Sequence, residues 1–157
     1  MVSDSGKLRI LFLCTGNSCR SQMAEAWTRR LKGDLIDAYS AGVSPAGVFP
    51  ETIDVMKEVG IDISDAESNH VNDFADVDFD NVVTLCGNAR ENCPNFPGKT
   101  KVTHVGFEDP PWLARNARTK EEVLVHYRRI RDEIRDFVET LPDTLNGMQD
   151  KREEENG

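Results

Sequence analysis

The chain has 157 residues, of which 38% are hydrophobic, and a net charge of −9. This length suits one compact domain with a buried core, and no stretch approaches the ~20 apolar residues of a membrane helix. The acidic charge argues against nucleic acid as a partner, because binding to a phosphate backbone needs clustered Lys and Arg. It does not exclude a small anion, since salt limits the reach of distant charges to ~8 Å and the donors within a pocket then dominate.

Apolar runs near the N-terminus are short. The longest covers residues 10–13, which is too short for the core of a signal peptide. The sequence therefore predicts a cytoplasmic protein. In that compartment its four cysteines are expected to serve metal binding or redox chemistry rather than static disulfides.

Strand-like and helix-like patterns alternate along the chain. Short apolar runs predict strands, and apolar residues at three- and four-residue steps predict helices. The predicted strands cover residues 8–13, 35–41, 81–85 and 101–105. The predicted helices end at Gly33, at Gly60 and near Thr140, and the last of them begins at Thr119. This alternation predicts an α/β fold, with a four-stranded parallel sheet flanked by helices.

Local signals support two of these helices. The inner face of the first is expected to contain Met23, Ala26, Trp27 and Leu31. The last begins with Thr119 followed three residues later by Glu122, a capping box.

One domain accounts for most of the chain. Residues 1–7 are expected to be flexible, residues 8–141 to form a single domain, and residues 142–157 to be a disordered polar tail. Residues 87–100 contain Gly, Asn and Pro and predict a mobile loop.

Three chemically active residues follow predicted strands. Cys14 ends the first strand, Cys86 ends the third, and Asp109 lies in the loop after the fourth. Ligands of parallel α/β sheets bind beyond the carboxyl ends of the strands. These residues are therefore expected to meet at one edge of the sheet.

The segment between the first strand and the first helix has the spacing of an anion-binding loop. Such a loop points successive backbone N–H groups and the positive end of a helix dipole into one concavity. Gly16 permits the turn, and the Arg20 guanidinium is suited to clamp two oxygens of a tetrahedral anion. A thiol at Cys14 is expected to be acidic there and to act as a nucleophile, with Ser21 donating a hydrogen bond to its sulfur. The predicted oxyanion-binding residues are Thr15, Gly16, Asn17, Ser18, Cys19 and Arg20.

Structural explanations compete with these assignments. A lone cysteine at a strand end is more often a packing residue, but Gly16 and Arg20 at their spacings make that reading weak for Cys14. Cys19 is better read as a small packing residue. An Asp before Pro is usually a turn residue. The position of Asp109, opposite the Cys14–Arg20 loop, favours a general acid instead.

The stretch from Cys14 to Ala26 resembles the opening of the thioredoxin-coupled arsenate reductases, which share the fold of the low-molecular-weight protein tyrosine phosphatases. The resemblance runs from about Leu8 to Leu141. Its other motifs lie at residues 39–42, 83–86, 92–94 and 106–110.

The resemblance implies a three-cysteine relay. Cys14 attacks arsenic(V) while Asp109 protonates the departing hydroxyl, and Cys86 then attacks Cys14 and releases arsenite. Cys93 attacks Cys86 in turn, and thioredoxin reduces the Cys86–Cys93 disulfide. The resemblance implies no tightly bound cofactor, and we expect a monomer.

Closing a disulfide needs Cα atoms within about 7 Å. If residues 86–93 are helical, their ends lie ~10 Å apart. Gly87 and the adjoining Pro94 make this a poor helix, so a conformational switch in residues 86–96 is expected.

Two other functions stay open. A phosphatase of this fold also needs Cys14, Arg20 and Asp109, but it typically has aromatic residues after the Asp-Pro pair, where this chain has Pro111 and Trp112. It also has no need of a Cys-x6-Cys pair. A non-enzymatic arsenite or zinc sensor is the other alternative, although structural zinc more often uses a Cys-x2-Cys spacing.

Some relatives bind potassium near the anion loop. Asn17, Glu25, Ser40 and Asp73 stand at the matching positions, the last across an apparent insertion after Ser64. The resemblance thus implies a potassium site formed by these four residues.

Overall fold

A computed structural model describes residues 6–96 and 98–147. Eleven elements occur in these two ranges. In chain order they are β1 (Leu8–Cys14), α1 (Arg20–Lys32), β2 (Ile36–Gly42), α2 (Pro50–Glu58), the 3₁₀ helix η1 (Val71–Phe74), β3 (Asn81–Thr84), α3 (Gly87–Glu91), β4 (Lys101–His104), α4 (Pro110–Leu113), α5 (Lys120–Glu139) and α6 (Asp143–Asn146).

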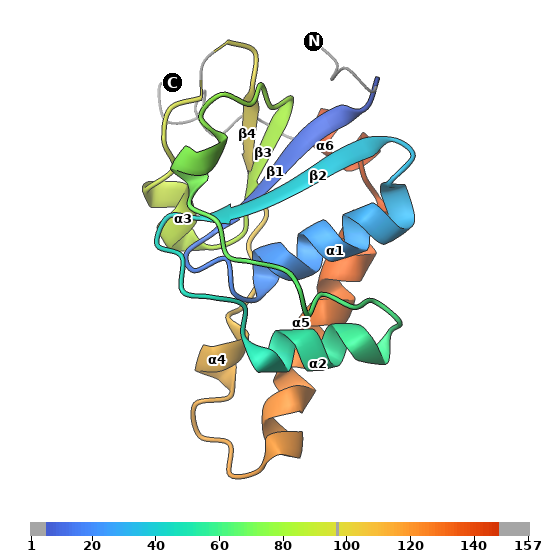
Figure 1. Ribbon diagram of the computed structural model, residues 1–157, viewed down its shortest axis with the longest axis vertical. Helices are drawn as coiled ribbons and strands as arrows, with labels where there is room; N and C mark the ends of the chain where they lie inside the picture. The colour runs from blue at the N-terminus through green and yellow to red at the C-terminus, as the bar shows by residue number, and fades with distance from the viewer. Residues whose placement is uncertain (1–5, 97, 148–157) are drawn as a thin grey trace.

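The four strands form one parallel sheet in the order β2-β1-β3-β4 (Figure 1). β1 lies in the interior of the sheet, where Leu11 is opposite Tyr39 on one side and Val82 on the other. A parallel strand in this position is covered on both faces, which explains its nearly continuous apolar sequence. The predicted α/β fold with a four-stranded parallel sheet is confirmed.

Successive residues of β1 point to opposite faces of the sheet, and each face has its own core. Ile10 and Phe12 pack with the side on which α1, α2 and α5 lie. Leu11 and Leu13 pack on the opposite side with Phe79. Residues from both cores therefore reach the end of β1, where Cys14 stands.

Helix boundaries follow local signals. Pro50 is the first residue of α2, a position where its missing N–H costs nothing. The capping box before α5 is present: the Thr119 side chain accepts from the Glu122 N–H, and the Glu122 carboxylate accepts from the Thr119 N–H. No helix in the described part of the chain is long and apolar enough to cross a membrane.

Three local predictions are wrong. Leu31 is not on the inner face of α1, because it is 40% exposed while Met23, Ala26 and Trp27 are buried. Residues 87–91 form α3 rather than a loop, since the Cys86 sulfur caps the helix by accepting the Ala89 N–H.

The third wrong prediction is that the chain is disordered from residue 142. Asp143–Asn146 form α6, because Leu145 is 1% exposed in the core and its carbonyl accepts from the Lys101 ammonium. Residues 148–157 and the N-terminal residues 1–5, which were also predicted to be flexible, lie outside the described residues.

Candidate active site

The loop from Cys14 to Arg20 connects the carboxyl end of β1 to the first residue of α1. Its turn depends on Asn17, which has a φ of +52° and is fully buried. The left-handed region is costly for most side chains and least so for Asn. Here the strain is offset by hydrogen bonds that fix the residue in place.

Asn17 is held by four hydrogen bonds. Its side-chain amide donates to Ser21 Oγ at 2.8 Å, and its side-chain oxygen accepts from the Asn69 N–H at 2.9 Å. Its backbone carbonyl accepts from Ser68 Oγ at 2.8 Å and from Gln22 Nε2 at 3.2 Å. The loop is thus held in place by residues of α1 and by residues 68–69. Because the Ser21 hydroxyl accepts from the Asn17 amide, its own proton stays available for a second partner.

Gly42, at the end of β2, lies against this loop. A Cβ atom at this position would stand 2.5 Å from the Thr15 carbonyl oxygen and 2.9 Å from the Asn17 nitrogen. Only a glycine lets β2 and the loop approach this closely. Sequence reasoning assigned Gly42 no role, although it is part of the residue 39–42 motif.

A cavity of about 300 Å³ opens over the loop. It brings together residues from the loop, residues 46–49 and the segment after β4. Its lining residues are Cys14, Thr15, Gly16, Ser18, Cys19, Arg20, Ala46, Phe49, Asp109 and Pro111. The predicted oxyanion residues, apart from the bracing Asn17, therefore share one cavity with Asp109.

Arg20 joins the loop to the segment that contains Asp109. One terminal nitrogen of its guanidinium donates to the Phe107 carbonyl at 2.9 Å, and the other lies 3.4 Å from Asp109 Oδ1. Among the described residues its buried Nε–H has no hydrogen-bond partner. An unpaired buried N–H is costly, and an oxyanion in the cavity would satisfy it.

Trp112 does not line this cavity. It is 62% exposed and stacks under the Arg115 guanidinium at 3.8 Å, whereas its neighbour Pro111 faces the cavity.

Cys86 reaches the same place from β3. None of the four cysteines is in a disulfide, and the Cys14 thiol donates to Cys86 Sγ at 3.8 Å. Cys86 Sγ lies at the N-terminus of α3, where it accepts from the Ala89 N–H at 3.4 Å. Thr15 Oγ1 lies 3.3 Å from the same sulfur and donates to Asn88 Oδ1 at 3.2 Å. The two sulfurs are therefore in contact although 72 positions separate them in sequence.

The two thiols share one proton unequally. The hydrogen bond from Cys14, with further ones from Thr15 and Ala89, lowers the pKa of Cys86 to about 5. The pKa of Cys14 is raised, first because it donates to Cys86 and then because it is buried. The expectation of an acidic Cys14 is therefore wrong for this arrangement. Donors converge on the sulfur of Cys86, and they favour its thiolate form.

Cys93 lies beyond the other end of α3. It is half-buried against the core that contains Phe79, and its thiol donates to the Pro94 carbonyl at 3.5 Å. Cys93 follows Cys86 by seven positions, which would span roughly 10 Å if all of them were helical. The 3.8 Å sulfur contact joins Cys14 and Cys86, while Cys93 lies two residues beyond the end of α3.

Cys19 packs in the core of the α1 face, as expected of a small packing residue. Burial raises the pKa of its thiol to about 12.

The four implied potassium ligands have other partners. Ser40 Oγ donates to Glu25 Oε1 at 2.6 Å, and Arg29 forms an ion pair with Glu25 Oε2 at 2.9 Å. Asp73 accepts the His70 N–H in the capping box of η1. Glu25 already faces a cation within the chain, so these residues do not fit a potassium site as they are arranged.

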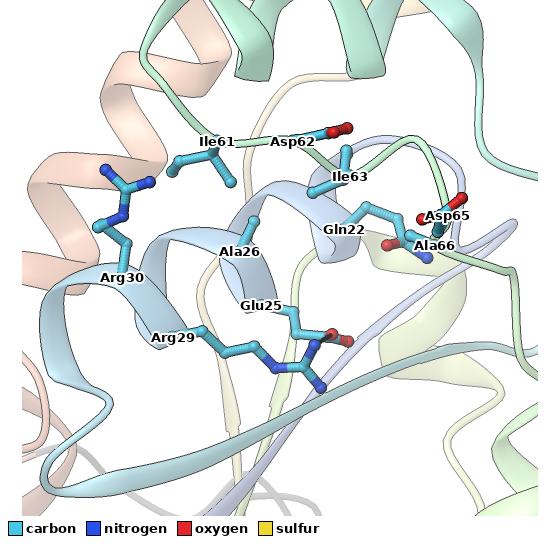
Figure 2. Close-up of a pocket in the computed structure, with 10 residues that line it drawn as sticks. All are labelled: Gln22, Glu25, Ala26, Arg29, Arg30, Ile61, Asp62, Ile63, Asp65 and Ala66. Carbon is cyan, nitrogen blue, oxygen red and sulfur yellow. Dashed lines mark ion pairs between the residues drawn. The ribbon is translucent and has the colours of Figure 1, made fainter.

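A second cavity of about 460 Å³ lies along α1 (Figure 2). It is formed by one face of α1 and residues 61–66, and the Glu25–Arg29 ion pair lies on its wall. None of its lining residues is a cysteine. It is separate from the cavity over the anion loop.

The fold and the Cys14–Arg20 loop define a class of enzymes, and comparison with known proteins identifies it. Residues 9–152 match the model of the low molecular weight phosphotyrosine protein phosphatases. The chain belongs to this family.

Several relatives within this family are arsenate reductases. The arsenate reductase of Bacillus subtilis (strain 168) is 48% identical over 139 residues, which cover 83% of this chain and 95% of that protein. A solved structure of an arsenate reductase in the phosphate binding state has a TM-score of 0.68 and 33% identity, covering 85% of this chain and 95% of the other. A thioredoxin-dependent arsenate reductase from Corynebacterium glutamicum has a TM-score of 0.65 and 28% identity, covering 94% and 66%.

Proposed function

We propose that this chain reduces arsenate to arsenite, for arsenic detoxification, and that thioredoxin reduces the disulfide that results. The 3.8 Å contact between Cys14 Sγ and Cys86 Sγ supports reduction more than any other single observation. A hydrolytic phosphatase needs one nucleophilic sulfur at this place, whereas a reductase needs a second sulfur to take the first into a disulfide.

In the first step the oxyanion binds over the loop, with Arg20 clamping two of its oxygens through the Nε–H and a terminal N–H. The Cys14 sulfur bonds to arsenic(V) and displaces one hydroxyl as water. Dihydrogen arsenate and the thiol thus give a thiol–arsenate adduct and one water, and the thiol hydrogen leaves in that water. Asp109, 3.4 Å from Arg20, is placed to protonate the departing hydroxyl.

In the second step the Cys86 sulfur attacks Cys14. The Cys14–arsenic bond breaks, its electron pair stays on arsenic, and arsenite departs as arsenic(III). The two sulfurs lose those two electrons as they form a disulfide. The lowered pKa of Cys86 favours this attack, because the thiolate is the nucleophile in such exchange.

In the third step Cys93 attacks Cys86, frees Cys14, and forms the Cys86–Cys93 disulfide. Because α3 holds the two cysteines apart, the helix must unwind first. α3 has only five residues and begins at Gly87, so the cost of unwinding is small.

Thioredoxin is proposed as the reductant because it exchanges dithiol for disulfide, and because a structural relative is thioredoxin-dependent. We further propose that the protein acts in the cytoplasm, where thioredoxin keeps thiols reduced. We also propose that it is a monomer. The relay assigns no step to potassium. We expect the rate of arsenate reduction to be equal in sodium and potassium salts. A higher rate in potassium alone would support the potassium site that the resemblance implies.

Hydrolysis of a phosphomonoester is the second candidate. Phe49 and Pro111 give the 300 Å³ cavity an apolar wall, which is more than a lone arsenate needs and suits an organic group. The retained Asp109 would protonate its leaving oxygen.

One assay separates these functions. Arsenate-dependent NADPH oxidation is measured with thioredoxin and thioredoxin reductase, for the wild type and for Cys86→Ser and Cys93→Ser. The wild type is expected to turn over and both variants to stop, while Cys86→Ser keeps phosphomonoesterase activity. An inactive wild type that hydrolyses phosphoesters would overturn the reductase in favour of the phosphatase.

A further inference from the structure

The spacing of the two active-site sulfurs suits more than a disulfide. A disulfide bond is about 2.05 Å long, whereas Cys14 Sγ and Cys86 Sγ lie 3.8 Å apart. Two bonds of about 2.3 Å, the length of a metal–thiolate bond, meeting at one pyramidal atom hold their sulfurs roughly 3.5 Å apart. The reduced pair is therefore close to the separation that a single bridging atom requires.

Trivalent arsenic has the chemistry for this place. Arsenite is a neutral hydroxide near pH 7, so the anion loop and Arg20 do not attract it as they attract arsenate. Arsenic(III) is soft, and soft centres select thiolate sulfur over oxygen. The two sulfurs are the soft ligands nearest to the point where the proposed reaction releases arsenite.

We propose that the reduced Cys14–Cys86 pair binds arsenite as a two-sulfur chelate, so that the product inhibits the enzyme at its own active site. Arsenous acid and two thiols give one hydroxyarsenic bridge and two molecules of water. Two As–O bonds and two S–H bonds break, two As–S bonds and the O–H bonds of water form, and no atom is oxidised or reduced. Only the inhibition of the enzyme by its product rests on the proposed function. The binding of arsenite itself needs neither arsenate nor thioredoxin.

Neighbouring groups favour this pair over Cys86 and Cys93. Thr15 Oγ1, 3.3 Å from Cys86 Sγ, stands beside the pair and can hydrogen-bond the hydroxyl that remains on arsenic. Chelation by Cys86 and Cys93 would require α3 to unwind, since Cys93 lies beyond its far end. The Cys14–Cys86 pair needs no such change.

The chelate leaves neither sulfur available. Cys14 cannot attack arsenate and Cys86 cannot form the disulfide while arsenic bridges them. Accumulated arsenite would therefore slow its own production, and its removal would restore the rate.

The test uses the full-length protein reduced with a phosphine, which adds no competing thiol, and sodium arsenite as the probe. Intact-mass measurement under native conditions gives the amount of adduct, and alkylation of the remaining thiols identifies the protected cysteines. The wild type and Cys93→Ser are expected to bind one arsenic and to protect Cys14 and Cys86. Cys14→Ser and Cys86→Ser are expected to bind at least about 100-fold more weakly, because they lose the second linked site.

Three results would overturn the proposal: no adduct in the wild type, an adduct of undiminished affinity in Cys14→Ser, or loss of the adduct in Cys93→Ser. The last would assign the chelate to Cys86 and Cys93. Arsenate turnover is measured separately on the same samples. Turnover without an adduct would contradict the chelate and leave the reductase standing, whereas an adduct without turnover would contradict the reductase alone.

Discussion

The anion loop and the segment that contains Cys86 and Cys93 supply the two halves of the proposed chemistry, and they are built in opposite ways. In the anion loop, Asn17 is fully buried and held by hydrogen bonds from two directions, and Gly42 packs against its backbone. In the second segment, α3 is one short helix whose cap is the reactive sulfur of Cys86 itself. The anion loop therefore resists movement, whereas α3 is capped by the Cys86 sulfur, which the proposed reaction converts into a disulfide.

This difference suits the two tasks. An oxyanion is bound well by donors that are already in position, since no reorganisation is then needed when it arrives. A disulfide relay needs one sulfur to reach two partners in succession, which a fixed segment cannot provide. When Cys86 enters a disulfide it ceases to be a thiolate cap, so the chemistry itself weakens the start of α3.

The largest expected effect comes from the anion loop. Arg20→Lys keeps the charge but loses the planar fork that holds two oxygens. We expect kcat/KM to fall by about 10²–10³-fold for both arsenate reduction and phosphoester hydrolysis. Steady-state kinetics with both substrates tests this. Loss of only one activity would contradict a shared oxyanion site.

Gly42→Ala tests the rigidity of the loop. Its Cβ would meet the Thr15 carbonyl oxygen at 2.5 Å, so the backbone of the loop must move. We expect the free energy of unfolding to fall by roughly 1–3 kcal/mol, as in other overpacked sites, and both activities to fall with it. Urea unfolding measures the stability. Gly98→Ala is not a matched control because its φ is +72°, whereas Gly147→Ala meets only the Thr144 carbonyl oxygen, at an ordinary 3.8 Å, and is suitable.

Gly87→Ala, whose Cβ would meet no atom within 4 Å, tests the second segment. Alanine stabilises a helix by about 1 kcal/mol relative to glycine, so α3 becomes harder to unwind. We expect the transfer of the disulfide from Cys14–Cys86 to Cys86–Cys93 to slow by up to about five-fold, with phosphoester hydrolysis unchanged. Rapid-quench alkylation after one turnover follows the transfer. An unchanged rate would mean that unwinding of α3 does not limit it.

The smallest expected effect is on the titration of Cys86. Its pKa is lowered to about 5, so its thiolate persists above that pH and is lost as the pH falls through it. The hydrogen bond from Cys14 is the largest cause, so Cys14→Ala, which removes the donor, is expected to move the midpoint of Cys86 alkylation to higher pH. The rate of alkylation by iodoacetamide between pH 4 and 9 gives both midpoints. An identical midpoint in the two proteins would show that the thiols do not share a proton.

Features that depend on neighbouring residues were predictable from the sequence. The four strands, the capping box before α5 and the spacing of Cys14 and Arg20 all arise from periods or contacts within a few residues. Patterns of this kind predicted the parallel sheet and the edge at which Cys14, Cys86 and Asp109 meet. The roles of Cys86 and Cys93 in a relay came from resemblance to a family, because spacing alone left a phosphatase open.

Only the tertiary structure decided how distant groups act on one another. The contact between Cys14 and Cys86 joins the end of β1 to the segment after β3, and it lowers the pKa of Cys86 while it raises that of Cys14. Packing likewise turned the start of the expected tail into α6 and left Leu31 exposed. By itself the sequence determined which residues could do chemistry and on which edge of the sheet they stand. The fold decided in which direction the pKa of each sulfur moves, because the pKa of a thiol depends on the groups packed around it.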